Sequence, residues 1–456
     1  MTAAGRTNAL RAAHAHLLAR RFAAARDLAQ PWSAEADGAL LYGLALAGSG
    51  AVAAAAALLA RIAAANPRAQ HPLQDLLGLV PPEDAIPHLR AGLEWRPDDP
   101  RLLALLGQRL AERGPAAEAI DCFRRAAHVQ PGDASAWSNL GKACAAEARF
   151  DEANEAFDRA LRLTPGDAWI GYNRALMLLK AGRSAEGWTA LRVRHALPGR
   201  PPPLPGMRLQ TLDVAGRRVL LRHEEGFGDT LQFIRYARPL AERGAHVIAA
   251  VPPALARLVA TAAGVAEVVA GPVLPPYDVW SPLLDVPALF GGAAGMAIPY
   301  LRAKPGRALP PGRKAGLVWA GDPKAPADRI RSVPDASLLP LRDVPGWTWV
   351  NLQLGRAPAF PMHDPMPAVR DFADTAAIVA QLDLVVSADT AVAHLAGALG
   401  KPVVLLDRYD HCWRWGARTE TTAWYPSMRI VRQPSPGDWD GAVADVVRRL
   451  TAGCAP

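Results

Sequence analysis

The first half of the sequence repeats itself every 34 residues, and this period constrains the fold more than any other feature. Pro97, Pro131 and Pro165 are separated by that interval, as are the aspartates two residues after each of them. The interval also relates apolar and small residues, namely Leu106 to Leu140, Gly107 to Gly141, Ala119 to Ala153, Phe123 to Phe157 and Ala126 to Ala160. A fixed period of about 20–50 residues is typical of stacked helical repeats. Small residues let antiparallel helices approach closely, and we expect an α-helical solenoid.

These positions resemble the tetratricopeptide repeat, most clearly in residues 100–165. The copy at 168–197 is weaker, because Gly171 stands where Trp137 stood. Residues 42–67 fit the same frame, and the copy that ends at Pro97 is about four residues short of the period. A degenerate first hairpin is expected near residues 8–30. The sequence therefore predicts about five or six hairpins over residues 1–198.

Asn139 and Asn173 occupy the same repeat position, on the first helix of their hairpins. The arrays attached to protein O-GlcNAc transferases look similar there, and the resemblance implies asparagines that line a groove and grip a peptide backbone. An asparagine amide can donate and accept at once, which suits a peptide unit. The alternative is that both side chains are solvated or lie between hairpins.

Length and charge narrow the function classes. A chain of 456 residues is expected to form two or three domains. The net charge is +8, but the basic residues are scattered, and no run of five or more occurs. Nucleic-acid-binding proteins more often concentrate their charge in one stripe or arm. We expect instead a phosphate-bearing small ligand or an acidic acceptor.

The cysteines and the apolar segments bear on the compartment. Cys122, Cys144, Cys412 and Cys454 show no CxxC spacing and no histidine-rich companion, which disfavours a zinc site and indicates free thiols. The N-terminal residues lack an apolar stretch suited to a signal peptide. Residues 51–59 are too short to cross a bilayer, which needs about 20 apolar residues. We expect a cytoplasmic protein without membrane insertion.

A proline-rich segment, residues 197–207, separates the repeats from a second half with a different pattern. Short β-rich runs and helical stretches alternate there, and the alternation restarts after a second Pro/Gly-rich break at residues 304–312. Such alternation implies parallel sheets in two successive Rossmann-like domains. The predicted fold class is thus α plus α/β. The predicted domains are a solenoid at 1–198, a linker at 199–209, and two Rossmann-like domains at 210–310 and 311–456.

Individual elements of this half can be placed from their pattern. Strands are predicted at 217–222, 246–251, 265–269, 277–280, 315–319, 347–352, 382–387 and 403–406. Helices are predicted at 229–243, 253–263, 375–381 and 389–399. Ligands of such sheets bind at the carboxyl ends of the strands.

The sharpest local motif is one strand–helix–strand unit, residues 383–406. Its strand ends at Ser387, and Asp389 or Thr390 caps the next helix. A helix N-terminus beside a strand end favours phosphate, and Thr390 and His394 share a helix face in its first turns. The motif resembles the signature of the bacterial heptosyltransferase family, whose members bind the diphosphate of a nucleotide sugar there. Ala391 departs from it, since the family often has Gly. The alternative is an ordinary capped helix.

A second motif runs from residue 217 to 240, where a strand leads into a loop and a helix. The loop holds Gly226 and Gly228, two of the three glycines of a dinucleotide fingerprint, so it supports NAD binding only weakly. It resembles the first loop of the same family, which implies that Asp229 accepts the proton of the acceptor hydroxyl. Alternatively, Asp229 and Gln232 form a helix capping box. Glu224 or Glu225 is the reserve base.

Two further segments are candidates for binding. Residues 316–334 follow a strand and supply Lys324 and Arg329, which would neutralise the charge of a leaving nucleotide; the alternative is a solvated basic loop. Trp413 and Arg414 follow another predicted strand end and resemble the matching segment of repeat-fused, heptosyltransferase-like proteins. They are candidate donor or acceptor contacts, as are Glu225, Gly226 and Gly228, although packing explains large aromatic side chains equally well.

Missing motifs exclude other enzyme classes. The one Asp-x-Asp of this half, Asp438 to Asp440, precedes the final helix instead of ending a strand, which disfavours a manganese-dependent transferase. No Gly-x-Ser-x-Gly or Walker-type loop occurs, which weakens the hydrolase and P-loop readings.

The resemblances together imply a repeat-fused glycosyltransferase of the two-Rossmann (GT-B) architecture. We expect transfer from a nucleotide sugar to an acceptor hydroxyl without a metal or a further cofactor, and analogy with the family favours inversion. The repeats would recruit a protein acceptor, such as flagellin or another surface protein, and solenoids often form homo-oligomers. The alternatives are a non-catalytic adaptor that retains a nucleotide-sugar-binding fold, and a transferase whose acceptor is lipid-linked or a polysaccharide.

Overall fold

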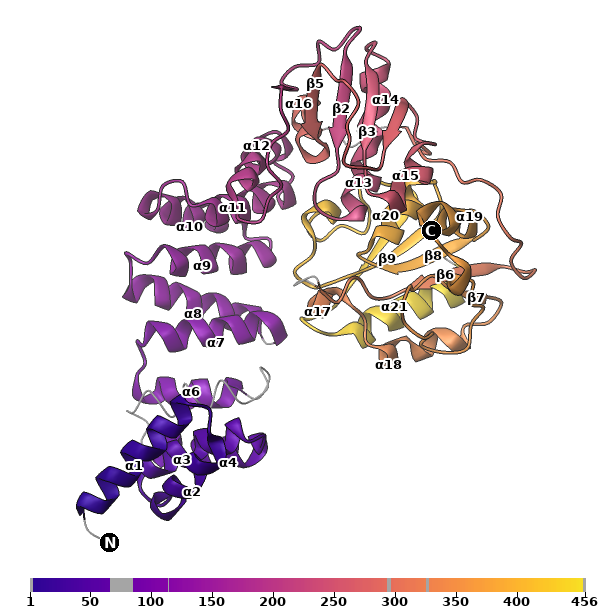
Figure 1. Ribbon diagram of the computed structural model, residues 1–456. Helices are drawn as coiled ribbons and strands as arrows, with labels where there is room; N and C mark the ends of the chain where they lie inside the picture. The colour runs from indigo at the N-terminus through magenta and orange to yellow at the C-terminus, as the bar shows by residue number, and fades with distance from the viewer. Residues whose placement is uncertain (1–2, 66–84, 114, 293–296, 325–327, 454–456) are drawn as a thin grey trace. The chain divides into compact units, whose positions relative to one another are not determined.

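The computed structural model describes residues 3–65, 85–113, 115–292, 297–324 and 328–453. Backbone contacts divide the chain into two compact units, Met1–Ala143 and Cys144–Pro456. These units group residues by their contacts and do not test the domain limits expected from the sequence, which stay a prediction. Figure 1 labels the helices and strands of both units.

The first unit is built of helices in antiparallel pairs (Figure 1). Its described helices are α1 (Ala3–Leu18), α2 (Phe22–Ala29), α3 (Ala36–Gly48), α4 (Val52–Ala65), α6 (Ala85–Trp95), α7 (Pro100–Arg113), α8 (Ala116–Val129) and most of α9 (Ala134–Ala146). A Cβ at Gly107 of α7 would lie 2.9 Å from the ring of Phe123 in α8, so the periodic glycine is required by close helix packing. The predicted solenoid is confirmed, and part of the shortened copy before Pro97 lies outside the described residues.

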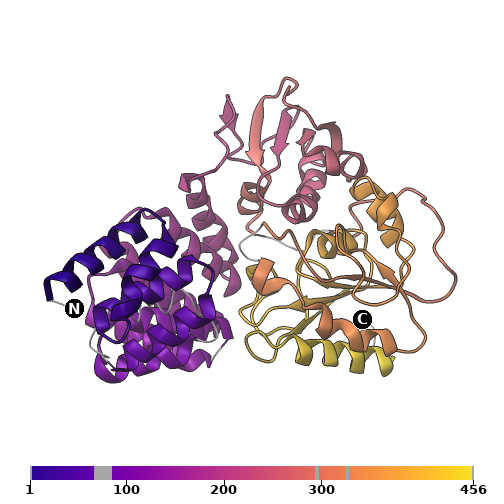
Figure 2. The same ribbon diagram turned by 60° about the horizontal axis from the view of Figure 1, so that its bottom comes forward.

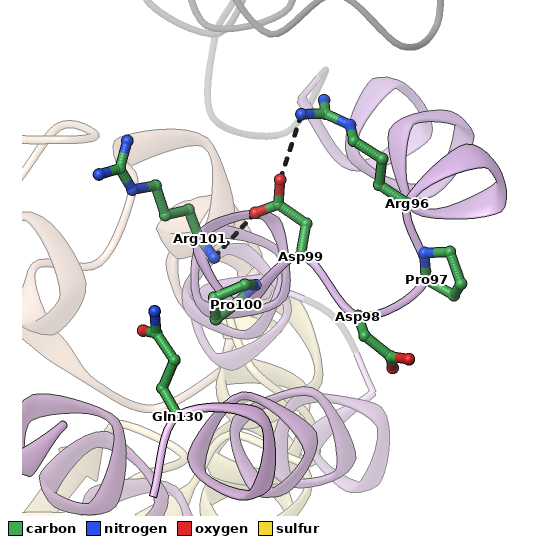
Figure 3. A pocket seen from close by; sticks show the side chains of 7 residues that line it. All are labelled: Arg96, Pro97, Asp98, Asp99, Pro100, Arg101 and Gln130. Atoms are coloured by element: carbon green, nitrogen blue, oxygen red, sulfur yellow. Dashed lines mark hydrogen bonds and ion pairs between the residues drawn. The ribbon is translucent and has the colours of Figure 1, made fainter. Parts of the chain in front are cut away.

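The periodic aspartates Asp99, Asp133 and Asp167 cap the first helix of three successive hairpins. The Asp99 carboxylate accepts hydrogen bonds from the backbone N–H groups of Arg101 and Leu102, at 3.0 and 3.1 Å. Asp133 accepts from Ser135 in the same way, at 2.8 Å. Figure 3 shows Asp99 beside Arg96, which pairs with it at 3.2 Å, in an open pocket at the turn before α7. The 34-residue spacing of these aspartates thus follows from helix capping.

The second unit begins with the last hairpins of the solenoid and continues into two sheets. Its first helices are α10 (Phe150–Leu163), α11 (Ala168–Lys180) and α12 (Ser184–Ala190), followed by the 3-10 turn η3 (Leu191–Ala196). One core cluster contains Leu179, Trp188 and Leu191 from these elements together with residues of both sheets. The last hairpin is therefore packed into the α/β part of the unit.

The first sheet has five parallel strands in the order β1-β5-β2-β3-β4. They are β1 (Met207–Arg208), β2 (Arg218–Arg222), β3 (His246–Ala250), β4 (Val265–Val269) and β5 (Val279–Pro282). One face packs against α13 (Phe227–Phe233), α14 (Ala237–Ala241), α15 (Pro253–Val259) and α16 (Val286–Leu289). On the other face, Trp280 of β5 packs with Leu204 of the linker and with Tyr277. The proline-rich segment thus covers part of the sheet.

The second sheet also has five parallel strands, in the order β10-β9-β8-β6-β7. They are β6 (Lys314–Val318), β7 (Thr348–Asn351), β8 (Leu384–Ala388), β9 (Val403–Asp407) and β10 (Met428–Arg432). In Figures 1 and 2, α18 (Asp335–Leu338) and α21 (Trp439–Thr451) lie on one face, and α19 (Phe372–Val379) and α20 (Ala391–Ala398) on the other. Both faces are buried, which explains the continuous apolar runs of β8 and β9.

The predicted fold class is confirmed, and the differences lie in single elements. The helix expected at 229–243 is broken, because α13 begins at Phe227 and ends at Phe233, before a 3-10 turn and the short α14. The two-residue β1 and the strand β10 were not predicted. The pair Asp438 and Asp440 lies at the start of α21, where Asp438 accepts from the Gly441 N–H at 2.8 Å.

Two further observations concern the whole chain. Cys122, Cys144 and Cys412 are buried and form no disulfide, whereas Cys454 lies outside the described residues. Within the described ranges, none of the helices combines the length and the apolar character that crossing a bilayer requires.

Candidate functional site

The N-terminal turns of α13 and α20 meet in the second unit. A Cβ added to Gly228 would lie 2.8 Å from Cδ2 of His394 and 3.5 Å from Cα of Ala391. A glycine is therefore needed at 228 for one helix start to lie against the other. This contact brings the loop that carries Asp229 together with the motif that carries Thr390, as expected for the two halves of one site.

Asp229 lies in the first turn of α13, three residues after the N-cap residue Gly226. Its Oδ2 accepts a hydrogen bond from the Gly226 N–H at 3.0 Å, and its Oδ1 forms an ion pair with Nη2 of Arg414. The capping alternative from the sequence is wrong in its detail, because Asp229 is not the N-cap residue and Gln232 does not close a box with it. Gln232 instead accepts from Nε of Arg414 at 2.9 Å. Both oxygens of Asp229 thus have a donor.

Arg414 lies in the 3-10 turn η8 (Trp413–Trp415) and reaches across to α13. Burial opposes its charged form, but Asp229, Cys412 and Asp389 together outweigh burial and raise the pKa of Arg414 above its ordinary value. The guanidinium lies 4.3 Å from the ring centroid of Trp413. Arg414 is thus a fixed cation that links the two Rossmann-like parts of the unit.

Trp413 is held by other aromatic side chains. Its ring stacks on Phe233 of α13, with centroids 6.5 Å apart, and meets the ring of Trp188 from the last hairpin edge-on at 5.3 Å. Trp188 is 2% exposed. This packing explains why a large aromatic residue stands at position 413. Contact of Trp413 with a sugar donor or an acceptor stays a prediction.

Thr390 is the N-cap residue of α20, and its side chain makes no capping hydrogen bond. Its hydroxyl lies 3.3 Å from that of Ser387, at the carboxyl end of β8. Asp389 and Thr390 are both half-buried. The first N–H groups of α20 therefore have no side-chain acceptor at the N-cap, and the dipole of this eight-residue helix favours an anion there.

His394 lies one turn further along α20 and is only 4% exposed. Its Nδ1 lies 3.0 Å from the hydroxyl of Tyr425, and its ring stacks on Trp415 at 5.1 Å. Burial, with the charges of Arg414 and Arg235, lowers the pKa of His394 well below its usual value. The imidazole is neutral and enclosed by aromatic side chains. Its expected contact with a pyrophosphate stays a prediction.

The basic segment after β6 lies apart from these contacts. Lys324 is exposed, and its backbone N–H donates to Asp322 at 2.9 Å. Arg329 lies in the short helix α17 (Asp328–Arg331), and its side chain lies outside the described part of the chain. In the described part, no contact joins Lys324 to Asp229 or Thr390. Phosphate binding by Lys324 and Arg329 stays a prediction.

Glu224 and Glu225, the reserve candidates for the catalytic base, each form an ion pair with an arginine. Glu224 is 7% exposed and pairs through both oxygens with the buried Arg194 of η3, at 3.1 and 2.7 Å. Glu225 pairs with Arg200 of the linker, and its backbone has a φ of 59°, which few residues other than glycine adopt. Neither carboxylate is presented as an unpaired base.

Sequence reasoning missed a buried ion network behind this loop. Arg194 also pairs with Asp285 at 2.8 Å, and Asp285 receives His195 at 3.1 Å and Arg208. Although burial acts against it, these partners lower the pKa of Asp285 to about 2. Arg194 and Asp285 are 91 positions apart in the sequence, and no local pattern marks them as partners.

The asparagines of the predicted peptide groove lie on the expected helices. Asn139 is on α9 and Asn173 on α11, and both are half-buried. Tyr172, next to Asn173, packs against the core of the second unit. Binding of a peptide by these asparagines stays a prediction.

A metal centre has no obvious place in the described ranges, because no group of three or more His, Cys, Asp or Glu side chains is arranged to hold an ion.

Comparisons with known proteins address both halves of the chain. Residues 134–167 match the family model of the tetratricopeptide repeat, and residues 369–435 match glycosyltransferase family 9 (heptosyltransferase). The second match includes β8, α20, β9 and Arg414. The chain therefore contains a tetratricopeptide repeat followed by a glycosyltransferase family 9 region, as its motifs suggested.

Among curated proteins, the chain is similar to Protein FlbA of Caulobacter vibrioides (strain ATCC 19089 / CIP 103742 / CB 15). The two are 30% identical over 333 residues, which is 62% of this chain and 55% of the relative. The chain thus spans about half the length of the curated relative that it matches.

Among solved structures, a crystal structure of MamA is 20% identical and covers 34% of this chain and 92% of that one, with a TM-score of 0.31. A structure of MamA from Desulfovibrio magneticus RS-1, from residue 41 to its end, is 16% identical, covers 37% and 99% of the two chains, and has a TM-score of 0.32.

Proposed function

We propose that the second unit transfers a sugar from a nucleotide-activated donor to the hydroxyl of an acceptor. The observation that carries this proposal is the family 9 match over residues 369–435, which includes the α20 start and Arg414. Fold alone would not specify an activity, because the same architecture hosts many functions. The contact between Gly228 and α20 adds a second loop with a carboxylate at the same place.

The donor's phosphates would bind at the start of α20. The N–H groups after Thr390 and the helix dipole favour a diphosphate, and the Thr390 hydroxyl can donate to it. Lys324 and Arg329 would supply the positive charge that a departing nucleotide needs, without a metal. The donor is then a co-substrate, and the proposal includes no other cofactor.

Asp229 would accept the proton of the acceptor hydroxyl. In the structure, Oδ1 of Asp229 is held in an ion pair with Arg414. We infer that donor phosphates compete for Arg414, whose guanidinium also lies in the field of Asp389 beside Thr390. Engagement of Arg414 by phosphate would release one oxygen of Asp229 when the donor is in place.

The acceptor would be a protein that the repeats recruit, such as flagellin or another surface protein. Solenoids bind extended segments along their curved surface, and Asn139 and Asn173 supply amides that suit a peptide backbone. This step rests on the tetratricopeptide match and on analogy with other repeat-fused transferases.

Two observations favour a second candidate, a non-catalytic adaptor that retains the fold. Both oxygens of Asp229 have donors, and His394 is enclosed. A chain that has lost transfer could keep both arrangements for stability alone. Such an adaptor would still bind a nucleotide sugar at α20 but would not turn it over.

The experiment is a turnover assay on the full chain with UDP-, GDP-, ADP- and CMP-sugars and a candidate protein acceptor. Release of the free nucleotide and labelling of the acceptor are measured together. We expect transfer from one donor class and its loss in Asp229→Asn with donor affinity retained. Asp213→Asn, an exposed position before β2, is the matched control.

The outcomes separate the candidates. Donor binding without transfer in the wild-type chain would favour the adaptor. Full turnover by Asp229→Asn would remove Asp229 from the catalytic role.

A further inference from the structure

A cavity of about 200 Å³ lies between the proline-rich linker and the first sheet. The linker residues 200–203 form one wall, and Arg222 and Pro282 form another at the carboxyl ends of β2 and β5. The rest of the lining is Arg208, His195, His223, Glu224 and Trp280. Carboxyl ends of parallel strands are where ligands of such sheets bind. The volume suits a small polar molecule.

Carboxylates around this cavity are already paired. Glu224 is engaged by Arg194 through both oxygens, Asp285 by Arg194, His195 and Arg208, and Glu225 by Arg200. Three carboxylates thus meet four arginines when Arg222 is included. The walls carry an excess of positive charge and present no unpaired acidic group to a cation.

Arg222 is the arginine of this group that is not paired with a carboxylate in the described ranges. In the described ranges it forms no ion pair, and its Nη1 donates only to the carbonyl of Pro202, at 2.7 Å. It is half-buried at the last position of β2. A guanidinium with one neutral partner keeps further donors for a planar oxyanion.

Trp280 also lines the cavity. The residue is 2% exposed, and its Nε1 is buried without a hydrogen-bond partner. The guanidinium of Arg208 lies 5.1 Å from the centroid of its ring. A wall with an unpaired arginine and two histidines is complementary to an acceptor of negative charge.

We propose that this cavity binds an oxyanion, the carboxylate or phosphate group of a small molecule, with Arg222 as its main donor. The inference rests on the cavity alone and does not require the proposed transferase activity. His223 connects the site to the neighbouring loop, because its Nδ1 lies 2.6 Å from the hydroxyl of Thr230 in α13. A bound anion would therefore lie against the loop that positions Asp229.

The test is calorimetric titration of the full chain with three probes, which are inorganic phosphate, glucuronate and glucose, at constant ionic strength. We expect saturable binding of phosphate or glucuronate, and the stronger of the two identifies the source of the oxyanion. Glucose, which resembles glucuronate in shape but is neutral, should not bind. Arg222→Gln should weaken binding of the anion about tenfold, since it removes a charged donor.

Arg217→Gln is the matched control, because it removes the same charge at the opposite end of β2 from an exposed side chain. Its affinity should equal that of the wild-type chain. The proposal is overturned if neither anion binds, if glucose binds as well as glucuronate, or if Arg217→Gln weakens binding as much as Arg222→Gln. None of these results bears on transfer from a nucleotide sugar, so the two proposals fail separately.

Discussion

At the scale of single residues, Gly228 decides whether the two halves of the candidate site can meet. The sequence shows this glycine as part of an incomplete dinucleotide fingerprint, which suggests a role in phosphate approach. The structure gives a steric reason instead, because His394 and Ala391 occupy the space that a side chain would need. In a single sequence, a glycine required by helix packing cannot be distinguished from a glycine required by a ligand.

Gly228→Ala should therefore destabilise the second unit. Its Cβ would lie 2.8 Å from the enclosed His394 ring, and relieving that overlap must shift α13 against α20, at a cost of about 1–3 kcal/mol. Chemical denaturation measures the change. Gly271→Ala, where a Cβ would meet nothing within 4 Å, is the control. Equal stability of the two variants would show that the helix starts do not pack as described.

His394 predicts a pH dependence of stability. Burial keeps its folded-state pKa well below 6.5, so acid protonates it in the unfolded chain first. Stability should fall as the pH drops below about 6.5, by about 1.4 kcal/mol per pH unit for each such histidine. His411, whose pKa burial and Lys180 lower to about 3, adds to the slope.

In His394→Gln the free energy of unfolding should change less steeply between pH 7 and 5, because unfolding then takes up one proton fewer. Thermal unfolding at several pH values measures it, and the exposed His14→Gln serves as control. A slope in His394→Gln that equals the wild-type slope would mean that the imidazole titrates normally in the folded chain.

At the scale of elements, the last hairpin is joined to the first sheet by the buried network around Arg194. Its guanidinium holds Glu224 after β2 and Asp285 after β5, and it is 0% exposed. Removing a buried cation leaves its carboxylates without compensation, which costs more than the pair contributes. The network thereby fixes the loop that precedes α13.

Arg194→Ala should destabilise the second unit by about 3–5 kcal/mol, because Glu224 and Asp285 stay buried. The midpoint of urea unfolding measures the loss. Arg183→Ala, which removes an exposed pair with Glu186, should leave the midpoint unchanged. If Arg194→Ala and Arg183→Ala unfold at the same urea concentration, the Arg194 network is exposed to solvent and the account of a buried network is contradicted.

Elements with a local signal could be predicted, and pairings across the sequence could not. The 34-residue period marked the helices because Asp99, Asp133 and Asp167 meet the same capping need in successive copies, and Gly107 is required by close packing. The alternation of β-rich runs with helical stretches marked the strands β2 and β8. In contrast, β1 has two residues and little pattern of its own, and Arg414 finds Asp229 across 185 positions. Asp229 and Thr390 were found only because motifs mark them, and their roles stay untested.

At the scale of the whole molecule, a helical repeat unit precedes a unit that contains the last hairpins and two parallel sheets. The repeat match crosses the boundary between the units, whereas the family 9 match lies within the second. The proposed donor site, the Asp229 loop and the linker cavity all belong to the second unit. Our proposals accordingly place the chemistry in that unit and recruitment of the acceptor on the repeats.

The most direct test of the central claim is calorimetric binding of UDP-, GDP-, ADP- and CMP-sugars to the full chain. We predict saturable binding of one nucleotide class, weakened about tenfold in Thr390→Val, which removes one hydroxyl donor to phosphate. Thr211→Val, an exposed position before β2, should bind as the wild-type chain does. If folded wild-type protein binds none of the four, the claim that α20 holds the phosphates of a nucleotide sugar is contradicted.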